Sequence, residues 1–160
     1  MKIEVDVVRK TSNELPKYET DGAAGCDVRA ELTHIKPEFL FDAHQNEDLS
    51  ITIEPFGRAL IPTGLFVAIP KGYEIQVRPR SGLALKKGLS LANCVGTIDS
   101  DYRQEAGVIC INLSNKPITI PQGERICQFV AAKVEQIIWN EVGELNKTNR
   151  LGGFGSTGTK

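Results

Sequence analysis

The 160-residue sequence predicts an all-β protein, built either as a barrel or as a double-sheet sandwich. Three observations lead to this fold class. Apolar and polar residues alternate in several short runs, proline and glycine separate these runs, and a single short segment has helical character. The length suits one domain whose hydrophobic core needs neither disulfides nor metal ions.

Strands are expected where apolar side chains recur at every second position, because such residues share one face of an extended chain. The runs with this alternation are 3–7, 51–54, 73–78 and 118–120. Two denser apolar runs, 65–69 and 108–113, are typical of strands that are buried on both faces or lie at a subunit contact. Turns are expected at the triplets in which proline precedes glycine by two positions, which begin at Pro55, Pro62, Pro70 and Pro121.

One short helix is expected after position 80. Ser81 is predicted as its N-cap, Leu83–Lys87 as its body and Gly88 as its stop, with lysines in the last turn. Residues 36–50 form a longer excursion with a polar end. We interpret this excursion as a surface loop, to which the sequence assigns no role.

The composition argues against several classes of function. The net charge is −1, which argues against general binding to nucleic acid or to a membrane surface. The first residues lack the apolar stretch of a signal peptide, and no run approaches the roughly 20 apolar residues of a membrane span. The four cysteines form no C-x-x-C pair and there are only two histidines, so no zinc site is expected. We interpret the cysteines as buried small apolar residues of a cytoplasmic protein.

The segment Arg78–Gly82 is the first candidate site. Free backbone N–H groups at a helix start, the Ser81 hydroxyl and an arginine side chain would converge on one point, which suits a phosphate group. Simple helix capping explains the same residues, so both interpretations stay open.

The segment Asn93–Arg103 is the second candidate site. Asn93 offers both a donor and an acceptor, as contact with the edge of a polar heterocycle requires. Asp99 can hold and deprotonate a water, and the Tyr102 ring can stack on a sugar. A polar hairpin turn is the plainer interpretation of this run.

Three further segments carry residues suited to binding. Asp27 lies in a tight run of small residues, and Gln128 lies in a turn that feeds a strand. The glycine-rich tail contains Arg150 and Phe154. The plainer interpretation is an ion pair for Asp27, an edge strand for the Gln128 segment and a disordered terminus for the tail. The chain lacks the motifs of a P-loop, a zinc deaminase and a nucleophile elbow.

Taken together, these five segments resemble the motifs of the trimeric dUTPase family, in that family's order. They read AAGCDVRA, RPRSGLA, NCVGTIDSDYR, GERICQF and RLGGFGSTG, and they span most of the chain from Ala23 to Gly158. Each motif is weak alone, but five in order on an all-β pattern are highly specific. The resemblance implies a jelly-roll-like, distorted β-barrel subunit with one short helix, and a homotrimer whose active sites lie at subunit interfaces.

The resemblance also implies an activity, the hydrolysis of dUTP to dUMP and pyrophosphate with Mg²⁺ as cofactor. It assigns Asp99 to the carboxylate that activates the water for in-line attack on the α-phosphorus. Asn93, with backbone groups near Thr97 and Ile98, corresponds to the uracil reader. Tyr102 corresponds to the ring that packs under the deoxyribose.

Further site residues follow from the same resemblance. The implied substrate contacts in the body of the protein are Arg80, Ser81, Gly82, Gly107 and Gln128, most of them on the phosphates. Asp27 is implied to support the metal indirectly, through water, while the triphosphate itself holds most of the Mg²⁺ coordination.

The last motif implies a mobile arm. Residues 1–143 are expected to form the barrel domain and 144–160 a flexible arm that closes over the active site. Within this arm the resemblance implies that Phe154 stacks on uracil, that Arg150 meets the γ-phosphate and that Gly155 also contacts the substrate.

Two alternatives accompany this interpretation. The first is an enzyme of the dCTP deaminase type on the same fold, whose chemistry needs a glutamate near the base, where this chain has Asp99 and Tyr102 instead. The second is a regulatory binding protein in which a nucleotide-gated arm controls a partner. The excursion 36–50 is the sequence feature that would suit such a partner.

Overall fold

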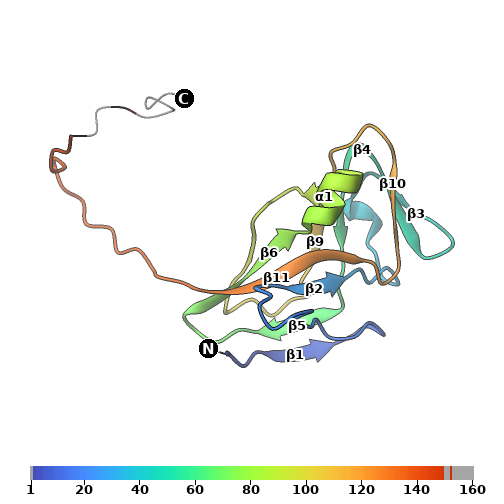
Figure 1. Ribbon diagram of the computed structural model, residues 1–160, viewed down its shortest axis with the longest axis horizontal. Helices are drawn as coiled ribbons and strands as arrows, with labels where there is room; N and C mark the ends of the chain where they lie inside the picture. Colours follow the sequence, from blue (N-terminus) through green and yellow to red (C-terminus); the bar gives the residue numbers. More distant parts are fainter. Residues whose placement is uncertain (1, 150–151, 153–160) are drawn as a thin grey trace.

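The computed structural model describes residues 2–149 and 152, and it has a jelly-roll-like, distorted barrel made mostly of strands (Figure 1). The strands are β1 (Asp6–Arg9), β2 (Cys26–Arg29), β3 (Leu40–Gln45), β4 (Ser50–Ile61), β5 (Leu65–Ala68), β6 (Tyr73–Pro79), β7 (Leu89–Leu91), β8 (Gly96–Ile98), β9 (Val108–Asn112), β10 (Ile118–Pro121) and β11 (Arg125–Lys133). A 3-10 turn, η1 (Pro37–Phe39), and one helix, α1 (Ser81–Lys87), complete the described part. The predicted all-β fold class is confirmed.

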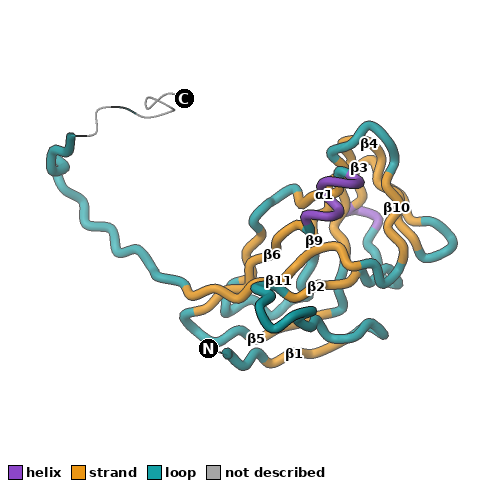
Figure 2. The backbone as a smooth tube through the Cα atoms, in the orientation of Figure 1, coloured by secondary structure: helices purple, strands orange, loops and turns teal. Residues whose placement is uncertain are grey.

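The strands form three sheets with antiparallel ladders. One sheet pairs β1 with β5, the second runs β10-β4-β9-β7 with β3 added on β4, and the third runs β2-β11-β6-β8. Figure 2 shows these strands as one layered body, which the chain leaves after β11. Neighbours in the sheets are mostly distant in sequence, so long-range pairing decides which side chains meet.

The core lies between the sheets because alternate residues of each strand point inward. Ile51, Ile53 and Ile61 of β4 are fully buried, as are Val28 of β2 and Cys127 of β11. Burying one large aliphatic side chain contributes about 1.5–3 kcal/mol. This core holds the ends of β2, β6, β8 and β11, where the candidate site residues lie, in fixed positions.

Most of the expected strands are present. β4, β5, β6, β9 and β10 confirm the strands predicted at 51–54, 65–69, 73–78, 108–113 and 118–120. The prediction for 3–7 is wrong in its bounds, because β1 spans Asp6–Arg9 and all four of its side chains are exposed. Pairing with β5 sets this strand, since Asp6 lies opposite Ala68 and Arg9 opposite Leu65.

One predicted turn is wrong. Pro55–Gly57 lies inside β4, where Phe56 has a φ of 62°. Opposite it on β3, Asp42 has a φ of 49° and the pairing register shifts between Phe41 and Ala43. The proline–glycine run therefore makes an irregularity in a long strand rather than a chain reversal. The other three triplets are turns, with Gly64, Gly72 and Gly123 at positive φ as expected.

The excursion 36–50 is a hairpin rather than a loop. After η1, β3 pairs with β4 along most of its length. The Asp48 carboxylate accepts both the backbone N–H and the hydroxyl of Ser50, which closes the turn between the two strands. The Phe41 ring packs under the Arg58 guanidinium at 4.4 Å. Local turn chemistry and cross-strand pairing together order this segment.

The helix is present but starts one residue earlier than predicted. The N-cap is Arg80, with extended backbone angles and no side-chain capping bond, and Ser81 is already helical. The Arg80 side chain instead bonds Asp27, a contact that local sequence does not reveal. Gly88 ends the helix in the left-handed region at a φ of 76°, as predicted.

The prediction of four buried cysteines is wrong for one of them. Cys110 and Cys127 are fully buried and Cys26 is half-buried, but Cys94 is exposed. Cys94 lies in the turn between β7 and β8. Among the described residues, no helix has the length and apolar character needed to cross a membrane.

Candidate active site

Asp27 organises one cluster of candidate residues. Its side chain, on β2, is only 8% exposed. It accepts hydrogen bonds from Arg80 Nε at 3.1 Å, from Arg125 Nη1 at 3.0 Å and from Gln128 Nε2 at 3.1 Å. Strand pairing brings these groups together, since Gln128 on β11 lies between Asp27 and Arg78 of the two neighbouring strands. The plainer interpretation of Asp27, an ion pair, is therefore correct in its geometry.

Arg125 belongs to this cluster although sequence analysis did not select it. Arg80 Nη1 donates to its carbonyl oxygen at 3.0 Å, which ties the two arginines together. The sequence feature that could have identified Arg125 is its position in the GERICQF segment, three residues before Gln128. Arg125 and Asp27 lie on neighbouring strands that are far apart in sequence, so they cannot be paired before the sheet order is known.

Asp27 and the two arginines bonded to it carry one net positive charge, which the exposed Glu19 balances from outside. Two guanidinium groups surround the single carboxylate of Asp27, and Glu19 meets Arg125 at 3.4 Å from an exposed position. Burial raises the pKa of the Cys127 thiol well above its ordinary value, and the nearby Cys110 and Asp27 add to this effect. The thiol therefore stays neutral, and the cluster can attract an anion such as a phosphate.

Ser81 and Gly82 lie exposed beside this cluster, at the start of α1. A methyl group built on Gly82 would meet no atom within 4 Å. The space beside Ser81 and Gly82, where a phosphate would bind, is therefore not filled by other described residues.

A second group of candidates lies in the turn that connects β7 of one sheet to β8 of another, and in β8 itself. Asn93 and Thr97 are exposed, whereas the Ile98 side chain is buried, so only its backbone can face a ligand. A methyl group on Gly96 would lie 3.2 Å from the Asn93 amide nitrogen and 3.2 Å from Val77. Glycine here lets the Asn93 amide lie flat against the strand.

Asp99 and Tyr102 occupy the loop that follows β8. Asp99 lines an open groove of ≈ 970 Å³ together with Lys71 and Tyr73. The Tyr102 N–H donates to the Asp99 carbonyl at 3.2 Å, and its hydroxyl donates to the Glu105 carbonyl at 3.1 Å. The Tyr102 ring is 41% exposed, so a face of it is open to a ligand.

Gly107, at the end of this loop, has a packing role in the chain. A methyl group there would lie 2.7 Å from Leu60 Cδ1. Glycine thus lets the loop return closely onto β4 before β9 begins.

The two groups of candidates do not meet within one chain. β8 runs antiparallel to β6 with Ile98 opposite Ile75, so Asp99 lies near the start of β6, while Arg80 follows its end. The five residue steps from Ile75 to Arg80 span roughly 17 Å at about 3.3 Å per residue. Asp99 and the Asp27 cluster therefore lie at opposite ends of the same strand.

The remaining predicted residues, Arg150, Phe154 and Gly155, lie outside the described residues. Within residues 2–149 and 152, no group of three or more histidine, cysteine, aspartate or glutamate side chains could hold a metal ion. A cation at the Asp27 cluster would thus need ligands from elsewhere.

The fold and these groups define a class: a β-barrel protein with two arginines around a buried carboxylate, an exposed asparagine in a turn, and an exposed aspartate and tyrosine in one loop. The sequence model of the dUTPase family matches residues 40–158. The chain belongs to the dUTPase family.

Curated relatives match over nearly the whole length. The chain is 53% identical over 158 residues to a deoxyuridine 5'-triphosphate nucleotidohydrolase of Fusobacterium nucleatum subsp. nucleatum, covering 98% of each. It is 48% identical over 157 residues to the protein of the same name from Finegoldia magna, covering 98% of this chain and 99% of the relative.

Solved structures share the fold at lower identity. A mutant dUTPase of Staphylococcus bacteriophage 80alpha with dUpNHpp superimposes with a TM-score of 0.77 at 22% identity, covering 99% of this chain and all of the other. A mutant dUTPase of phage phi11, described with a structural Mg(II) ion, gives a TM-score of 0.72 at 19% identity and covers 91% of this chain.

Proposed function

We propose that this chain hydrolyses dUTP to dUMP and pyrophosphate, with Asp99 activating the water that attacks the α-phosphorus in line. The observation that carries the proposal is the exposed Asp99 side chain, which has no hydrogen-bond partner among the described residues and shares a loop with the exposed Tyr102, in a chain of the dUTPase family. A carboxylate without a competing partner can orient a water and take its proton.

The other candidate residues bind the nucleotide in this proposal. Asn93 and the backbone at Thr97 and Ile98 pair with the uracil edge, where a mismatched base would leave a polar group without a partner. Tyr102 packs under the deoxyribose. The phosphate contacts are Arg80, Ser81, Gly82 and Gln128, and Gly107 completes the loop beside the sugar.

Mg²⁺ fits this site in an indirect role. Both Asp27 oxygens already accept bonds from cationic or amide donors, which oppose a metal ion bound directly to the carboxylate. Mg²⁺ favours substrate phosphates and water over a full protein cage, so Asp27 would reach it through water. The bound ion supplies charge neutralisation to the triphosphate.

The active site in this proposal is shared between chains of a homotrimer. Asp99 and Arg80 must act on the same triphosphate, yet roughly 17 Å of β6 separates their ends of the strand within one chain. After β11 the chain also extends away from the barrel, with Ile138 93% and Trp139 85% exposed (Figure 1). Large apolar side chains at such exposure favour a covering neighbour subunit.

The arm belongs to the same proposal. Residues 144–160, which follow the segment that leaves the barrel after β11, close over the nucleotide bound at a subunit interface. Phe154 stacks on uracil, Arg150 meets the γ-phosphate, and Gly155 allows the backbone to approach the substrate closely.

Turnover of purified protein tests the proposal. With Mg²⁺ and each deoxynucleoside triphosphate in turn, pyrophosphate release is expected to be at least about a hundredfold faster for dUTP than for dCTP. Equal rates for all nucleotides, or no release from dUTP, contradict it. Ammonia release from dCTP would favour the deaminase alternative, and full biological effect of an inactive Asp99→Asn chain would favour the regulatory one.

A further inference from the structure

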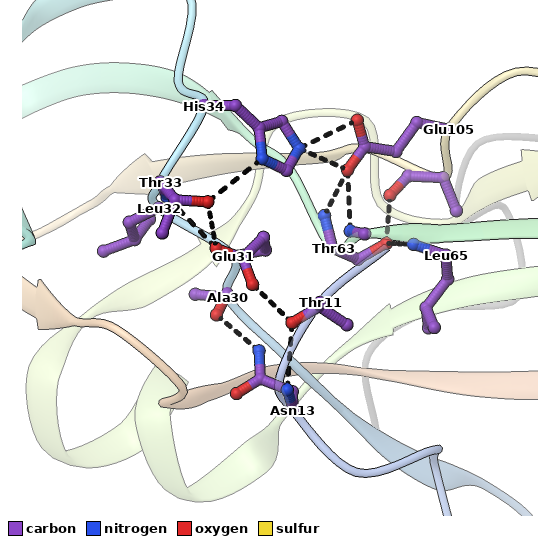
Figure 3. A network of polar contacts seen from close by, with 12 residues as sticks. Thr11, Asn13, Ala30, Glu31, Leu32, Thr33, His34, Thr63, Leu65 and Glu105 are labelled. Carbon is purple, nitrogen blue, oxygen red and sulfur yellow. Dashed lines mark hydrogen bonds and ion pairs between the residues drawn. The ribbon is translucent and has the colours of Figure 1, made fainter. Parts of the chain in front are cut away.

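Glu105 ties the loop that carries the candidate residues to the body of the barrel. Its carboxylate accepts the backbone N–H of Thr63 at 3.2 Å and of Gly64 at 2.6 Å (Figure 3). Its carbonyl oxygen accepts the Tyr102 hydroxyl at 3.1 Å. The position of the Tyr102 ring therefore depends on how firmly Glu105 is held.

His34 completes the set of donors around Glu105. Its Nε2 lies 3.1 Å from one Glu105 carboxylate oxygen and 3.3 Å from the other. On the other side of the ring, Nδ1 lies 3.3 Å from the Thr33 hydroxyl, which in turn lies 2.7 Å from the buried Glu31 carboxylate (Figure 3). His34 thus bridges the segment before the 36–50 hairpin and the loop of the candidate site.

One arrangement of protons satisfies all of these contacts at once. Thr33 has one hydroxyl proton, and its shorter contact is with the Glu31 carboxylate, so the proton goes there and the Thr33 oxygen accepts from Nδ1. The ionised Glu105 carboxylate can only accept, so Nε2 must also donate. An imidazole that donates at both nitrogens is the cation. The neutral form keeps both contacts only if the Thr33 hydroxyl turns away from Glu31.

We propose that His34 and Glu105 form a positioning pair for the nucleotide site. Protonated His34 holds Glu105, and through it Tyr102, in the geometry that binds dUTP most tightly. The inference rests on the proposed function of the loop that carries Tyr102. It adds a pH-sensitive residue outside the substrate contacts.

The charges around His34 set the direction of the pH effect. Glu105 faces the ring directly from the loop before β9, and Glu31 faces it through Thr33 from the segment after β2. Within residues 2–149, no lysine or arginine forms an ion pair with either carboxylate. The charge-assisted contact is therefore present while the imidazole is protonated and is absent when the imidazole is neutral.

The first test uses His34→Gln in the full-length chain, which keeps a neutral donor near Glu105 but removes the charge. KM and kcat for dUTP with Mg²⁺ are measured from about pH 6 to about pH 8, the range in which histidine usually titrates. The ratio of variant to wild-type KM at each pH cancels the titration of the nucleotide itself. This ratio is expected to be about threefold at the lower pH and about one at the upper, with kcat within about twofold.

His44 supplies a matched control. It is the other histidine of the chain, lies exposed on β3 and has no hydrogen-bond partner among the described residues. His44→Gln is expected to leave the KM ratio at about one at every pH. His34→Lys carries a cation throughout this range. Its KM ratio is therefore expected to be about one at the lower pH and below one at the upper pH.

A double-mutant cycle tests the pairing itself. Glu105→Gln keeps an oxygen for the two backbone N–H groups but removes the charge that His34 meets. It is expected to raise KM about threefold at the lower pH, and adding His34→Gln is expected to raise it no further. Independent effects of the two substitutions would overturn the pairing.

The outcomes separate this inference from the proposed function. If the wild type hydrolyses dUTP and the His34→Gln ratio does not change with pH, the positioning pair is overturned. If the wild type does not hydrolyse dUTP, the proposed function fails. Hydrogen exchange in peptides covering 99–107 then tests whether His34 and Glu105 hold the loop. Faster exchange in His34→Gln than in wild type at the lower pH supports the pair, and equal exchange overturns it.

Discussion

Asp27 and Asp99 are carboxylates of the same candidate site, but their surroundings differ. Asp27 is 8% exposed and bonded to Arg80, Arg125 and Gln128. Asp99 is exposed, and its carboxylate has no hydrogen-bond partner in the part of the chain that the structure describes. One carboxylate is committed to holding cationic side chains, while the other is free to take up a water.

This difference separates two kinds of function. A carboxylate that is already hydrogen-bonded and ion-paired is a poor proton acceptor, but it fixes its partners where they can meet phosphate. An exposed carboxylate costs little folding free energy because water solvates it, and it can serve as a general base. Substitutions at the two positions should therefore differ in their effects on turnover, binding and stability.

The largest effect is expected for Asp99→Asn. Loss of the general base should lower kcat for dUTP at least about a hundredfold, whereas KM changes little. Since the side chain has no partner among the described residues, the melting temperature should stay within about 2 °C of the wild type. Steady-state kinetics and thermal unfolding check both parts, and an unchanged kcat would show that the base is elsewhere.

Mixing two inactive chains should restore activity if the site is shared between subunits. Asp99→Asn lacks the base, and Arg80→Ala lacks a phosphate contact, so each assembly alone should be nearly inactive. After denaturation and refolding together in equal amounts, about a quarter of the sites would combine an intact Asp99 with an intact Arg80 from another chain. Mixed assemblies that remain inactive would place the complete site within one chain.

Asp27→Asn should affect both binding and stability. The substitution leaves Arg80 and Arg125 without their shared anion, so kcat/KM for dUTP should fall about tenfold and the free energy of unfolding by about 1–3 kcal/mol. Glu19→Gln is the matched control, because Glu19 meets Arg125 from an exposed position and should contribute less than about 0.5 kcal/mol. Chemical denaturation of both variants measures the difference. Equal losses would mean that burial of Asp27 does not strengthen its contacts.

The smallest effect on catalysis is expected for Glu31→Gln. Burial pushes the pKa of Glu31 upward, but hydrogen bonds from Thr11, Thr33 and Gln122 outweigh it and hold the pKa below the ordinary value. The stabilisation is therefore present at neutral pH and is lost as the pH falls through the lowered pKa.

The variant should be about 1 kcal/mol less stable at pH 7 and should lose less stability than wild type on acidification to about pH 3. Unfolding curves at both pH values check this. Turnover of dUTP near neutral pH should remain within about twofold of the wild type. A large loss of turnover would place Glu31 in the site rather than in the scaffold.

The sequence predicted the parts of the fold that depend on neighbouring residues. Alternation located three strands, denser apolar runs located two more, and three proline–glycine triplets located turns with glycine at positive φ. It failed at Pro55–Gly57, where β3 pairs across the irregularity and keeps the chain in one strand. It also failed at Ser81, because Arg80 was drawn to a carboxylate 53 positions away.

The candidate site residues also differ in whether neighbouring sequence or long-range pairing brings them together. Asn93, Asp99 and Tyr102 are close in sequence, so their positions in one turn–strand–loop segment could be predicted from their spacing. Arg125 was missed because its partner Asp27 is 98 positions away, and only the order of the strands brings the two side chains together.

The sequence by itself determined the all-β fold class, most strands and turns, and the residue types suited to a nucleotide, because periodicity and turn preference act over a few residues. Tertiary structure alone decided which charges meet. It paired Asp27 with two arginines, placed His34 on Glu105 and set Asp99 at the opposite end of β6 from Arg80. These outcomes depend on long-range strand register, which no local pattern specifies.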